Sequence, residues 1–566
     1  MKTTYSYDHF YLHEEITAIL KKYAAEHPEL CRLYSLNQTP EGREIWAMDV
    51  TNTKTGSYED KPAYCIDANI HAGEVTGSMA AMFFLDTIFS NLEDAEIQKI
   101  LDNYTFYVIP RITPDGSECY LTTPEMLRSA NRLYPYEELM PGLQPKDMDG
   151  DGVILKMRVK SPYGVWKVSD KDPRLMTKRK PDDLEGEFYN VYSEGYIEEY
   201  EGKPIETAPG KWGNDFNRNF PLSWTPEYSQ RGAGAYPLAN IETRSIAEFI
   251  SSHKNICSII NLHTMTGVYL YPPGSKHRSE APAEDMMRYK AIGKMATEET
   301  GYPAVSIIDE YMPKGAKPLT GSFDDFNYSL MGLHNYTIEC WDLNPRAGIP
   351  FVWPQPGPDD LTDEEKEEQH YKYIQWIDEH NDGEGFKPWT KFQHPQLGEV
   401  EIGGIDYKHV VQNPPLKYLY QEVEKHTRFF LRAVKTLPLI RFTKVKAERV
   451  DGQVYKVEAT LMNKGYLPTY VTGEAKNAKI VQDLVVSIEG EGIEFVQGKP
   501  CERIGQLNGF SCLGAQMSTL GPGTGNGEPC EKTITWIIKA APDTKLTVTG
   551  GNAKVGKTSA QVILGA

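Results

Sequence analysis

The sequence lacks any long run of apolar residues. Its most apolar stretch, Met79 to Phe89, is interrupted by Asp86 and is far shorter than the roughly 20 residues that a membrane-spanning helix needs. No signal peptide is evident, because the charged residues His13-Glu14-Glu15 precede any apolar segment of sufficient length. We therefore expect no membrane partner and a cytoplasmic location, and we leave an unorthodox export route open.

Paired cysteines and an excess of basic residues are also missing. The eight cysteines are scattered without a Cys-x-x-Cys pair, and Cys65 and Cys257 fall in apolar, strand-like runs, which favours reduced structural cysteines. Lysine and arginine number 60 against 79 acidic residues, for a formal net charge of −19. This deficit argues against nucleic acid or an anionic membrane as the main partner.

What the sequence does contain is an alternation of strand and helix patterns. Apolar runs at 63–69, 104–110 and 256–262 are short and bounded by polar residues, as is typical of strands buried on both faces. Helical patterns lie between them, at 74–90 and 239–253. The alternation predicts an α/β domain with a mixed, mostly parallel sheet flanked by helices, in which ligands bind at the carboxyl ends of the strands.

The length of 566 residues predicts more than one domain. We assign residues 1–437 to the α/β domain. Residues 133–212 are rich in Pro, Gly, Asp, Lys and Tyr with little periodicity, and we interpret them as a long insertion. Beyond Pro438 apolar and polar residues alternate between Gly-rich turns, which predicts an all-β sandwich over 438–566 without a catalytic constellation.

A histidine and a glutamate stand where the helix pattern 74–90 begins. His71 and Glu74 are three residues apart, so on a first helical turn they would project to the same side. Imidazole nitrogen and carboxylate oxygen both bind zinc, and a catalytic zinc usually has three protein ligands and one open position. His263, just past the strand pattern 256–262, is a candidate third ligand. By themselves, these residues are better explained as a chance pair and as a buried histidine at a strand end.

A second candidate metal site lies in the insertion. Asp147, Asp149 and Asp151 alternate with Met148 and Gly150, as carboxylates do in a calcium-binding loop. Arg158 occupies the position at which such a loop would supply its bidentate glutamate. A possible calcium site and a solvated Asp-Gly turn are therefore both open.

Five segments along the chain carry further recognisable motifs. In order they are His71-Ala72-Gly73-Glu74; Thr113-Pro114-Asp115-Gly116 with Arg128 twelve residues later; Asn214-Asp215-Phe216-Asn217-Arg218-Asn219-Phe220-Pro221; Leu262-His263-Thr264; and Thr337-Ile338-Glu339. Together, over roughly residues 10–437, they resemble the zinc metallocarboxypeptidase family, the carboxypeptidase A/B-like enzymes. Thr113 departs from the asparagine that the family has in its Asn-Pro-Asp-Gly turn.

The resemblance implies zinc as the cofactor, with His71, Glu74 and His263 as its ligands. Asp215 matches the carboxylate that accepts the outer N–H of the first histidine and fixes its tautomer. Glu339 matches the catalytic glutamate, which acts as general base on water.

Two arginines compete for one role in this comparison. Arg128 stands at the family's spacing for the arginine that stabilises the oxyanion of the reaction. Arg132, four residues further on, is its competitor.

The substrate class depends on Asn217 and Arg218. A planar guanidinium makes two parallel bonds to a carboxylate, and fixing a peptide's terminal carboxylate would place the last peptide bond at the metal. The resemblance therefore implies peptide or protein C-termini as the substrate. Without this anchor, the same chemistry would suit an amidase, a deacylase or a peptidoglycan-peptide hydrolase.

The selectivity position has two candidates. Alignment on Gly321-Ser322 selects Phe323 and an apolar C-terminal side chain, whereas counting back from Glu339 selects Asp324 and a basic one; we favour Asp324. Tyr311 is the best candidate for the family's substrate-capping tyrosine, although it stands several residues upstream of the expected position.

The function predicted from the sequence is zinc-dependent hydrolysis of the C-terminal peptide bond, with Glu339 as general base. A non-catalytic binding protein is the alternative from another class. The sequence does not determine the oligomeric state.

Overall fold

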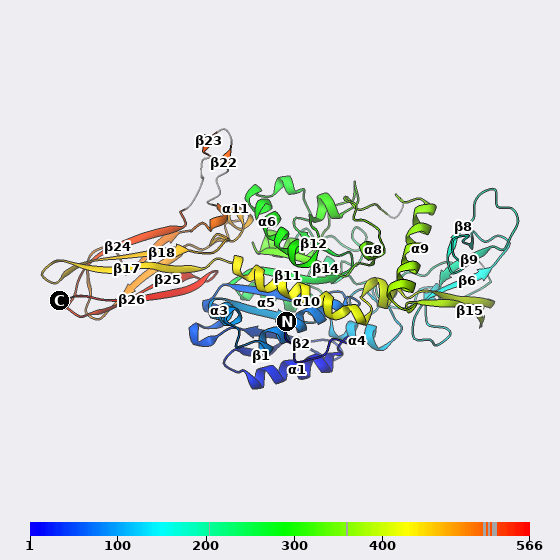
Figure 1. Ribbon diagram of the computed structural model, residues 1–566, viewed down its shortest axis with the longest axis horizontal. Coiled ribbons are helices and arrows are strands. Elements are labelled where there is room, and N and C mark those ends of the chain that lie inside the picture. Colours follow the sequence, from blue (N-terminus) through cyan, green and yellow to red (C-terminus); the bar gives the residue numbers. More distant parts are fainter. Residues whose placement is uncertain (203, 358–359, 513–516, 519–520, 523–528, 566) are drawn as a thin grey trace.

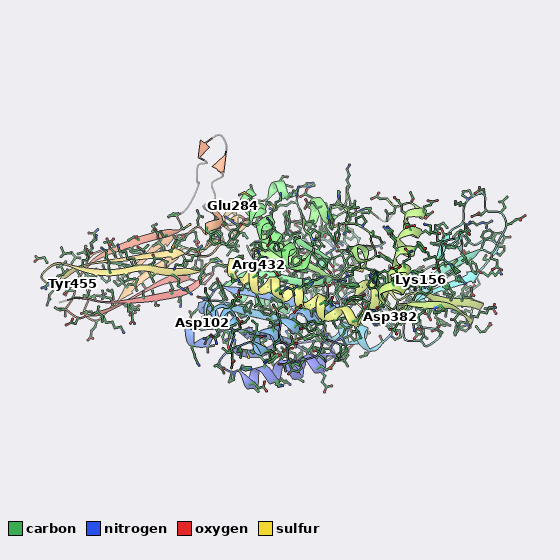
Figure 2. All side chains as sticks on the ribbon, viewed as in Figure 1. Asp102, Lys156, Glu284, Asp382, Arg432 and Tyr455 are labelled. Carbon is green, nitrogen blue, oxygen red and sulfur yellow. The ribbon has the colours of Figure 1, made fainter. Side chains whose placement is uncertain are left out.

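The protein has three parts that follow one another along its longest axis. The computed structural model describes residues 1–202, 204–357, 360–512, 517–518, 521–522 and 529–565. Figure 1 shows the C-terminal β-domain at one end, the α/β domain in the middle and a small β-module at the other end. Tyr455 and Lys156 mark the two outer parts in Figure 2.

The α/β domain is built on an eight-stranded sheet with the order β1-β2-β4-β3-β11-β14-β12-β13. The pairs β3–β4, β3–β11, β11–β14 and β12–β13 are parallel and the other three pairs are antiparallel. The predicted mixed, mostly parallel sheet is therefore confirmed. The strands are β1 (Cys31–Gln38), β2 (Glu44–Val50), β3 (Ala63–Ala68), β4 (Thr105–Ile109), β11 (Ile256–Thr264), β12 (Val268–Tyr271), β13 (Ala304–Ser306) and β14 (His334–Cys340).

Helices cover both faces of this sheet. One hydrophobic cluster joins it to α1, α2, α3, α6 and α10, and a second joins its other face to α5 and α7. The helices are α1 (His13–Glu26), α2 (Val75–Ser90), α3 (Ala95–Asn103), α4 (Pro114–Thr122), α5 (Ile241–Ser252), α6 (Ala283–Thr300), α7 (Phe323–Asp325), α8 (Leu343–Arg346), α9 (Asp363–His380) and α10 (Leu416–Ala433).

Short 3-10 and π-helical turns connect these elements. They are η1 (Thr53–Thr55), η2 (Tyr58–Asp60), η3 (Phe216–Arg218), η4 (Arg278–Glu280), η5 (Ile307–Tyr311), η6 (Phe326–Leu330), η7 (Tyr407–Gln412), η8 (Val434–Thr436) and η9 (Phe510–Cys512). Among the described residues no single helix is long and apolar enough to span a bilayer; α2 and α3 reach that threshold only as a pair bent by 110°.

The insertion folds into sheets of its own. Its strands are β5 (Gly142–Pro145), β6 (Lys156–Lys160), β7 (Trp166–Val168), β8 (Met176–Lys178), β9 (Tyr189–Ser193) and β10 (Gly195–Glu198). Four of them join β15 (Phe386–His394) and β16 (Gly398–Ile405) in the order β15-β16-β6-β9-β7-β8, and β5 pairs with β10. Hydrogen bonds between Tyr134 and both Lys211 and Gly213 close the base of the insertion.

The C-terminal domain consists of antiparallel sheets, as predicted. The two four-stranded sheets, β17-β18-β24-β20 and β21-β19-β25-β26, share one hydrophobic core. The elements are β17 (Ile440–Asp451), β18 (Val454–Asn463), α11 (Gly473–Asn477), β19 (Leu484–Glu489), β20 (Glu494–Gln497), β21 (Cys501–Gly505), β22 (Met517–Ser518), β23 (Gly521–Pro522), β24 (Glu531–Lys539), β25 (Lys545–Asn552) and β26 (Gly556–Ile563).

Candidate metal centre and substrate site

Three possible metal ligands meet at the carboxyl ends of β3 and β11. His71 follows β3, and His263 is the second-last residue of β11. Glu74 occupies the N-cap position of α2 and is not part of its first turn. The expected helical spacing is therefore wrong: a turn closed by the bond from Glu74 N–H to the carbonyl of His71 (3.1 Å) brings the pair together.

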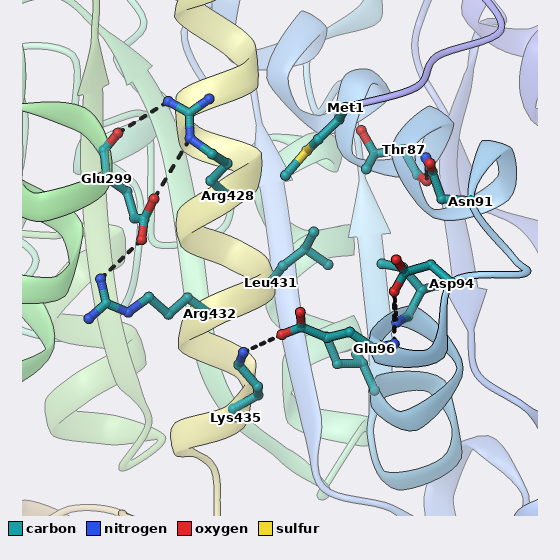
Figure 3. A pocket seen from close by; sticks show the side chains of 12 residues that line it. Met1, Thr87, Asn91, Asp94, Glu96, Glu299, Arg428, Leu431, Arg432 and Lys435 are labelled. Atoms are coloured by element: carbon teal, nitrogen blue, oxygen red, sulfur yellow. Dashed lines mark hydrogen bonds and ion pairs between the residues drawn. The ribbon is translucent and has the colours of Figure 1, made fainter.

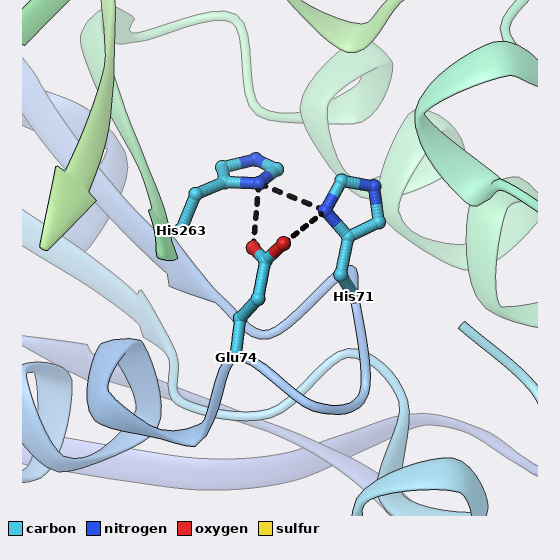
Figure 4. Close-up of side chains that lie close together, drawn as sticks. All are labelled: His71, Glu74 and His263. Carbon is cyan, nitrogen blue, oxygen red and sulfur yellow. Dashed lines mark hydrogen bonds and ion pairs between the residues drawn. The ribbon is translucent and has the colours of Figure 1, made fainter. Parts of the chain in front are cut away.

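The three side chains converge on a single point (Figure 4). Nδ1 of His71 lies 3.0 Å from Oε1 of Glu74, and Nδ1 of His263 lies 2.9 Å from Oε2. The two Nδ1 atoms are 3.0 Å apart. All three residues are buried. Two imidazole nitrogens and a carboxylate in this arrangement are a donor set that suits zinc.

Asp215 determines which nitrogen of His71 faces this point. Its Oδ1 lies 3.1 Å from Nε2 of His71, so Nε2 carries the proton and Nδ1 presents a lone pair. Burial lowers the pKa of His263, so that its imidazole is neutral. The two Nδ1 atoms and the Glu74 carboxylate face one point, and this donor set fits a zinc ion.

Arg128 spans the open side of the centre. Its Nη1 lies 3.0 Å from Oε1 of Glu74 and its Nε lies 3.2 Å from Oδ2 of Asp215. Although burial acts in the opposite direction, Arg128, Arg218 and His71 hold the pKa of Asp215 well below its usual value. The side chain of Arg128 is 45% exposed, so the guanidinium can reach an incoming ligand.

Arg132, the competitor from the sequence, points elsewhere. It forms a bidentate pair with Glu242 of α5, at 2.7 and 2.9 Å, and its guanidinium lies over the Phe216 ring. Glu242 thus binds both Nη1 and Nη2 of Arg132, the nitrogens that could otherwise bind a carboxylate or an oxyanion. Arg128 is therefore the arginine at the centre.

Sequence reasoning missed Asn69, which supports the loop that carries two ligands. Asn69 is buried in a left-handed conformation (φ 65°). Its amide donates to the carbonyls of His71 (2.6 Å) and Ala72 (3.2 Å) and accepts a bond from Ser78 (3.3 Å). An asparagine directly after a strand, where a positive φ is favourable, was a signal that could have identified it.

A close contact holds the next segment against this loop. A Cβ on Gly116 would lie 2.3 Å from the carbonyl oxygen of Ser129 and 2.7 Å from Cβ of Ala72. Only glycine allows this approach, and the backbone of Arg128 then accepts a bond from Ala72 N–H (2.7 Å). The Thr113-Pro-Asp-Gly turn therefore positions Arg128 beside the ligands.

Glu339 lies next to His263 on the neighbouring strand. The two residues are paired in the β11–β14 register. Among the described residues, the carboxylate of Glu339 makes no hydrogen bond. Burial and the charge of Glu74 raise the pKa of Glu339 well above its usual value, and Arg128 opposes them. This carboxyl is thus close to the metal centre and free to exchange a proton.

Asn217 and Arg218 lie one turn beyond Asp215. The Asn217 N–H donates to Oδ1 of Asp215 (2.9 Å), and its side-chain Oδ1 accepts a bond from Phe323 N–H (2.8 Å). The amide NH₂ of Asn217 is therefore left to donate to a ligand. Arg218 donates to the backbone carbonyl of Asn217 (2.6 Å), which holds its guanidinium against the same turn.

The structure distinguishes between Phe323 and Asp324. The Phe323 ring is buried against Phe220, with ring centroids 4.5 Å apart, and so belongs to the core. Asp324 bonds the hydroxyl of Thr337, and its charge raises the pKa of Glu339, after the larger effects of burial and Glu74. Asp324 is therefore the residue that faces the site.

Asn261 and Asp67 extend this polar surface and were not predicted. Asn261 lies between Asp67 and Thr337 in the strand register, and its amide donates to Asp67 (3.3 Å). The Oδ1 atom of Asn261 is buried without a partner among the described residues. Burial first, and then the charge of Asp324, raise the pKa of Asp67 well above its usual value.

Two tyrosines interact electrostatically with charged groups of the site. Burial, and then the charge of Glu339, raise the pKa of Tyr311, whose hydroxyl accepts a bond from Thr266 (3.5 Å). The predicted candidate therefore lies close to the centre despite its sequence position. Burial, and then the charge of Glu74, raise the pKa of Tyr407 of η7, and Arg128 opposes them. No motif marks Tyr407, so sequence reasoning could not have found it.

The predicted calcium loop behaves as a turn. Asp147, Asp149 and Asp151 lie close together, but each accepts backbone N–H bonds from within the loop. Arg158 pairs with Glu401 of β16 (2.7 Å). No further observation supports calcium.

A hollow away from the centre lies between α10, α3 and the N-terminus, with a volume of about 340 Å³. Figure 3 shows that its charged walls neutralise one another. Arg428 and Arg432 pair with Glu299, and Lys435 pairs with Glu96. These charges are already paired, so they do not call for a ligand.

The family model for zinc carboxypeptidases matches residues 16–355, which is more than half of the chain. The chain therefore belongs to the zinc carboxypeptidase family, and it carries the zinc-type triad His71, Glu74 and His263. A second family model, a domain of unknown function (DUF8731), matches residues 439–563.

The chain is similar to several proteins that are named carboxypeptidases. It is 23% identical over 351 residues to Carboxypeptidase A1 of Rattus norvegicus and covers 65% of that protein and 61% of itself. It is 24% identical over 288 residues to Zinc carboxypeptidase A 1 of Drosophila melanogaster, and the match covers 49% of that protein and 50% of this chain. The chain thus spans about half to two thirds of the length of these relatives. The solved Carboxypeptidase A from Helicoverpa Armigera aligns with a TM-score of 0.39 at 16% identity, over 68% of this chain and 76% of that one.

Proposed function

We propose that this protein is a metallocarboxypeptidase that removes the C-terminal residue of peptides or proteins. The observation that carries the proposal is the position of Asn217 and Arg218, which are joined to the metal centre through Asp215. An amide and a guanidinium beside the centre can bind a terminal carboxylate, which sets the last peptide bond at the metal.

The residues of the chain then divide the chemistry among them. A zinc ion held by His71, Glu74 and His263 would polarise water and the substrate carbonyl. Glu339 takes a proton from the attacking water and passes it to the departing amine, a transfer that its raised pKa favours. Arg128 stabilises the negative charge that develops on the carbonyl oxygen.

The substrate side chain is proposed to be basic. Asp324 and Asp67 are both buried near Asn261, whose Oδ1 atom has no partner among the described residues. A cationic side chain would neutralise these carboxylates and satisfy that acceptor. Phe323 supplies no apolar end to such a pocket, because its buried ring is packed against Phe220.

Replacing Glu339 by Gln tests the catalytic proposal. The variant should bind zinc as the native protein does but lose activity by about 100- to 10,000-fold, because it has no carboxylate to transfer the proton. Zinc content by elemental analysis and release of a C-terminal arginine by mass spectrometry measure the two effects. Full activity in this variant would contradict the assignment of Glu339.

A matched pair of peptides tests the substrate class. The native protein should cleave a peptide that ends in a free carboxylate and leave its C-terminally amidated twin intact, since only the first can bind to Asn217 and Arg218. Equal cleavage of both would favour an amidase or a deacylase of the same fold.

A further inference from the structure

The C-terminal domain touches the α/β domain close to the segment that carries Asp324. We name residues 321–332, which include α7 and η6, the pocket segment. Figure 1 shows α11 of the C-terminal domain beside α6, and Glu284 of α6 marks the junction in Figure 2. Both α6 and η6 contact α11.

One buried carboxylate joins the two domains to the pocket segment. Asp285 of α6 accepts bonds from the backbone N–H groups of Gly473 (2.7 Å) and Glu474 (3.1 Å), at the start of α11. Its second oxygen also accepts a bond from the hydroxyl of Tyr328 (2.9 Å), which belongs to the pocket segment. α11 and η6 are therefore fixed to the same group.

A second bond joins the C-terminal domain directly to the end of this segment. The hydroxyl of Thr472 donates to the carbonyl of Gly332 (3.0 Å). Gly332 has a φ of +67°, and a Cβ there would lie 2.5 Å from Cβ of Ala475. The chain can turn here only because position 332 is a glycine, and α11 closes over the turn.

The opposite end of the pocket segment reaches the proposed substrate groups. The carbonyl of Gly321 accepts a bond from Phe220 N–H (2.9 Å), and Phe323 N–H orients the amide of Asn217 (2.8 Å). Asp324 bonds Thr337 on β14, two residues before Glu339. A shift of the segment would therefore move both the carboxylate anchor and the selectivity residue.

We propose that the C-terminal domain is a positioning element for the substrate pocket, acting through Thr472 and Asp285 on the pocket segment. The proposal rests on the proposed function, since it concerns the same pocket. It assigns to the DUF8731 domain a part in substrate binding without contact between this domain and the substrate. Its loss should alter KM and the preference for the C-terminal residue more than kcat.

The test compares variants of the full-length, zinc-loaded protein on two peptides that differ only in a C-terminal Arg or Phe. Thr472→Val removes the bond to Gly332, and Tyr328→Phe removes the bond to Asp285. Each should raise KM for the Arg peptide about three- to tenfold and change kcat less than twofold. Thr472→Ser keeps the hydroxyl and should restore the native KM.

Lys554→Met is the matched control, because Lys554 lies in another part of the contact between the C-terminal domain and the α/β domain. The Nζ atom of Lys554 donates to the carbonyl of Ile256 (2.8 Å), at the start of β11 and outside the pocket segment. This variant should lower Tm and leave KM unchanged. The proposal would be overturned if both Thr472→Val and Tyr328→Phe kept the native KM and the native preference for the C-terminal residue. It would also be overturned if Lys554→Met raised KM equally. If the native protein releases no C-terminal residue at all, the proposed function itself fails.

Discussion

At the scale of single residues, Asp215 connects the metal centre to the substrate site. One oxygen lies 3.1 Å from Nε2 of His71 and accepts the Asn217 N–H (2.9 Å), and the other lies 3.2 Å from Nε of Arg128. The charge of this carboxylate therefore affects metal binding, the orientation of the arginine and the carboxylate anchor together.

Replacing Asp215 by Asn should weaken both zinc binding and catalysis. The amide keeps the shape but loses the charge that fixes the tautomer of His71, so zinc affinity should fall by about 10- to 100-fold. Competition with a chelator measures this affinity. Asp94→Asn, at the N-cap of α3, is the control and should bind zinc as tightly as the native protein. Native affinity in Asp215→Asn would contradict this role.

A second pair of variants separates Asp324 from Phe323. Asp324→Ser should lower kcat/KM for a C-terminal Arg peptide relative to a Phe peptide by at least about 30-fold, because the cationic side chain loses its buried partner. Phe323→Leu should leave this ratio unchanged and lower the free energy of unfolding by about 1 kcal/mol through lost packing. The reverse pattern would show that Phe323 is the selectivity residue.

Much of the site could be predicted because its chemistry requires particular residue types at fixed spacings. His71, Glu74 and His263 do meet, whereas Tyr311 stays a prediction, which the effect of the Glu339 charge on its pKa supports. Tyr407 could not be predicted, because it comes from a turn that follows the sheet of the insertion and carries no motif. Its position depends on tertiary packing alone.

At the scale of elements, the sheet of the insertion shows what periodicity cannot reveal. Its small core joins Val153, Leu155 and Met157 to Val400 and Ile402, and β16 pairs with β6 across more than two hundred residues of sequence. β7 and β8 are only three residues long, so the alternation is too short to stand out. The acidic start of α9 in part contacts this module, through an ion pair between Glu368 and Lys171 (2.6 Å).

β14 carries a buried histidine that should make stability depend on pH. Burial, and then the charge of Arg288, lower the pKa of His334 to about 3, whereas an unfolded histidine titrates near 6.5. Between these values only the unfolded chain binds the proton, so stability should fall as the pH falls from about 6.5 to 3.

The comparison of His334→Phe with the native protein isolates this effect. Between pH 7.5 and 5.0 the native protein should lose about 2 kcal/mol more unfolding free energy than the variant, as measured by urea denaturation. The phenylalanine ring can keep the stacking on Tyr289, where the ring centroids are now 4.4 Å apart. All other titrating groups are common to both proteins, so an identical pH dependence would rule out His334 as the source.

At the scale of the whole molecule, the C-terminal domain should unfold together with the α/β domain. The turn between β25 and β26 contacts the amino-terminal end of β11, an interior strand of the central sheet. Lys554 donates to the carbonyl of Ile256 (2.8 Å), and the Cys257 thiol lies 3.3 Å from the carbonyl of Lys554. Bonds at both this turn and α11 join the domains, so we expect one cooperative transition in calorimetry.

Gly556 offers a sharp test of this coupling. A Cβ there would lie 2.1 Å from the carbonyl oxygen of Asp60, with φ at +72°, so Gly556→Ala must push the β25–β26 turn away from the α/β domain. Gly452, in the β17–β18 turn, has a similar φ of +53° and nothing within 4 Å of its added Cβ. Gly452→Ala should therefore lower the free energy of unfolding only by the backbone strain, about 1 kcal/mol. Gly556→Ala should lower the free energy of unfolding by clearly more. It should also split the calorimetric transition into two, because the contact between the two domains is lost. If the two variants unfold alike, in one transition at the same Tm, the turn does not couple the domains.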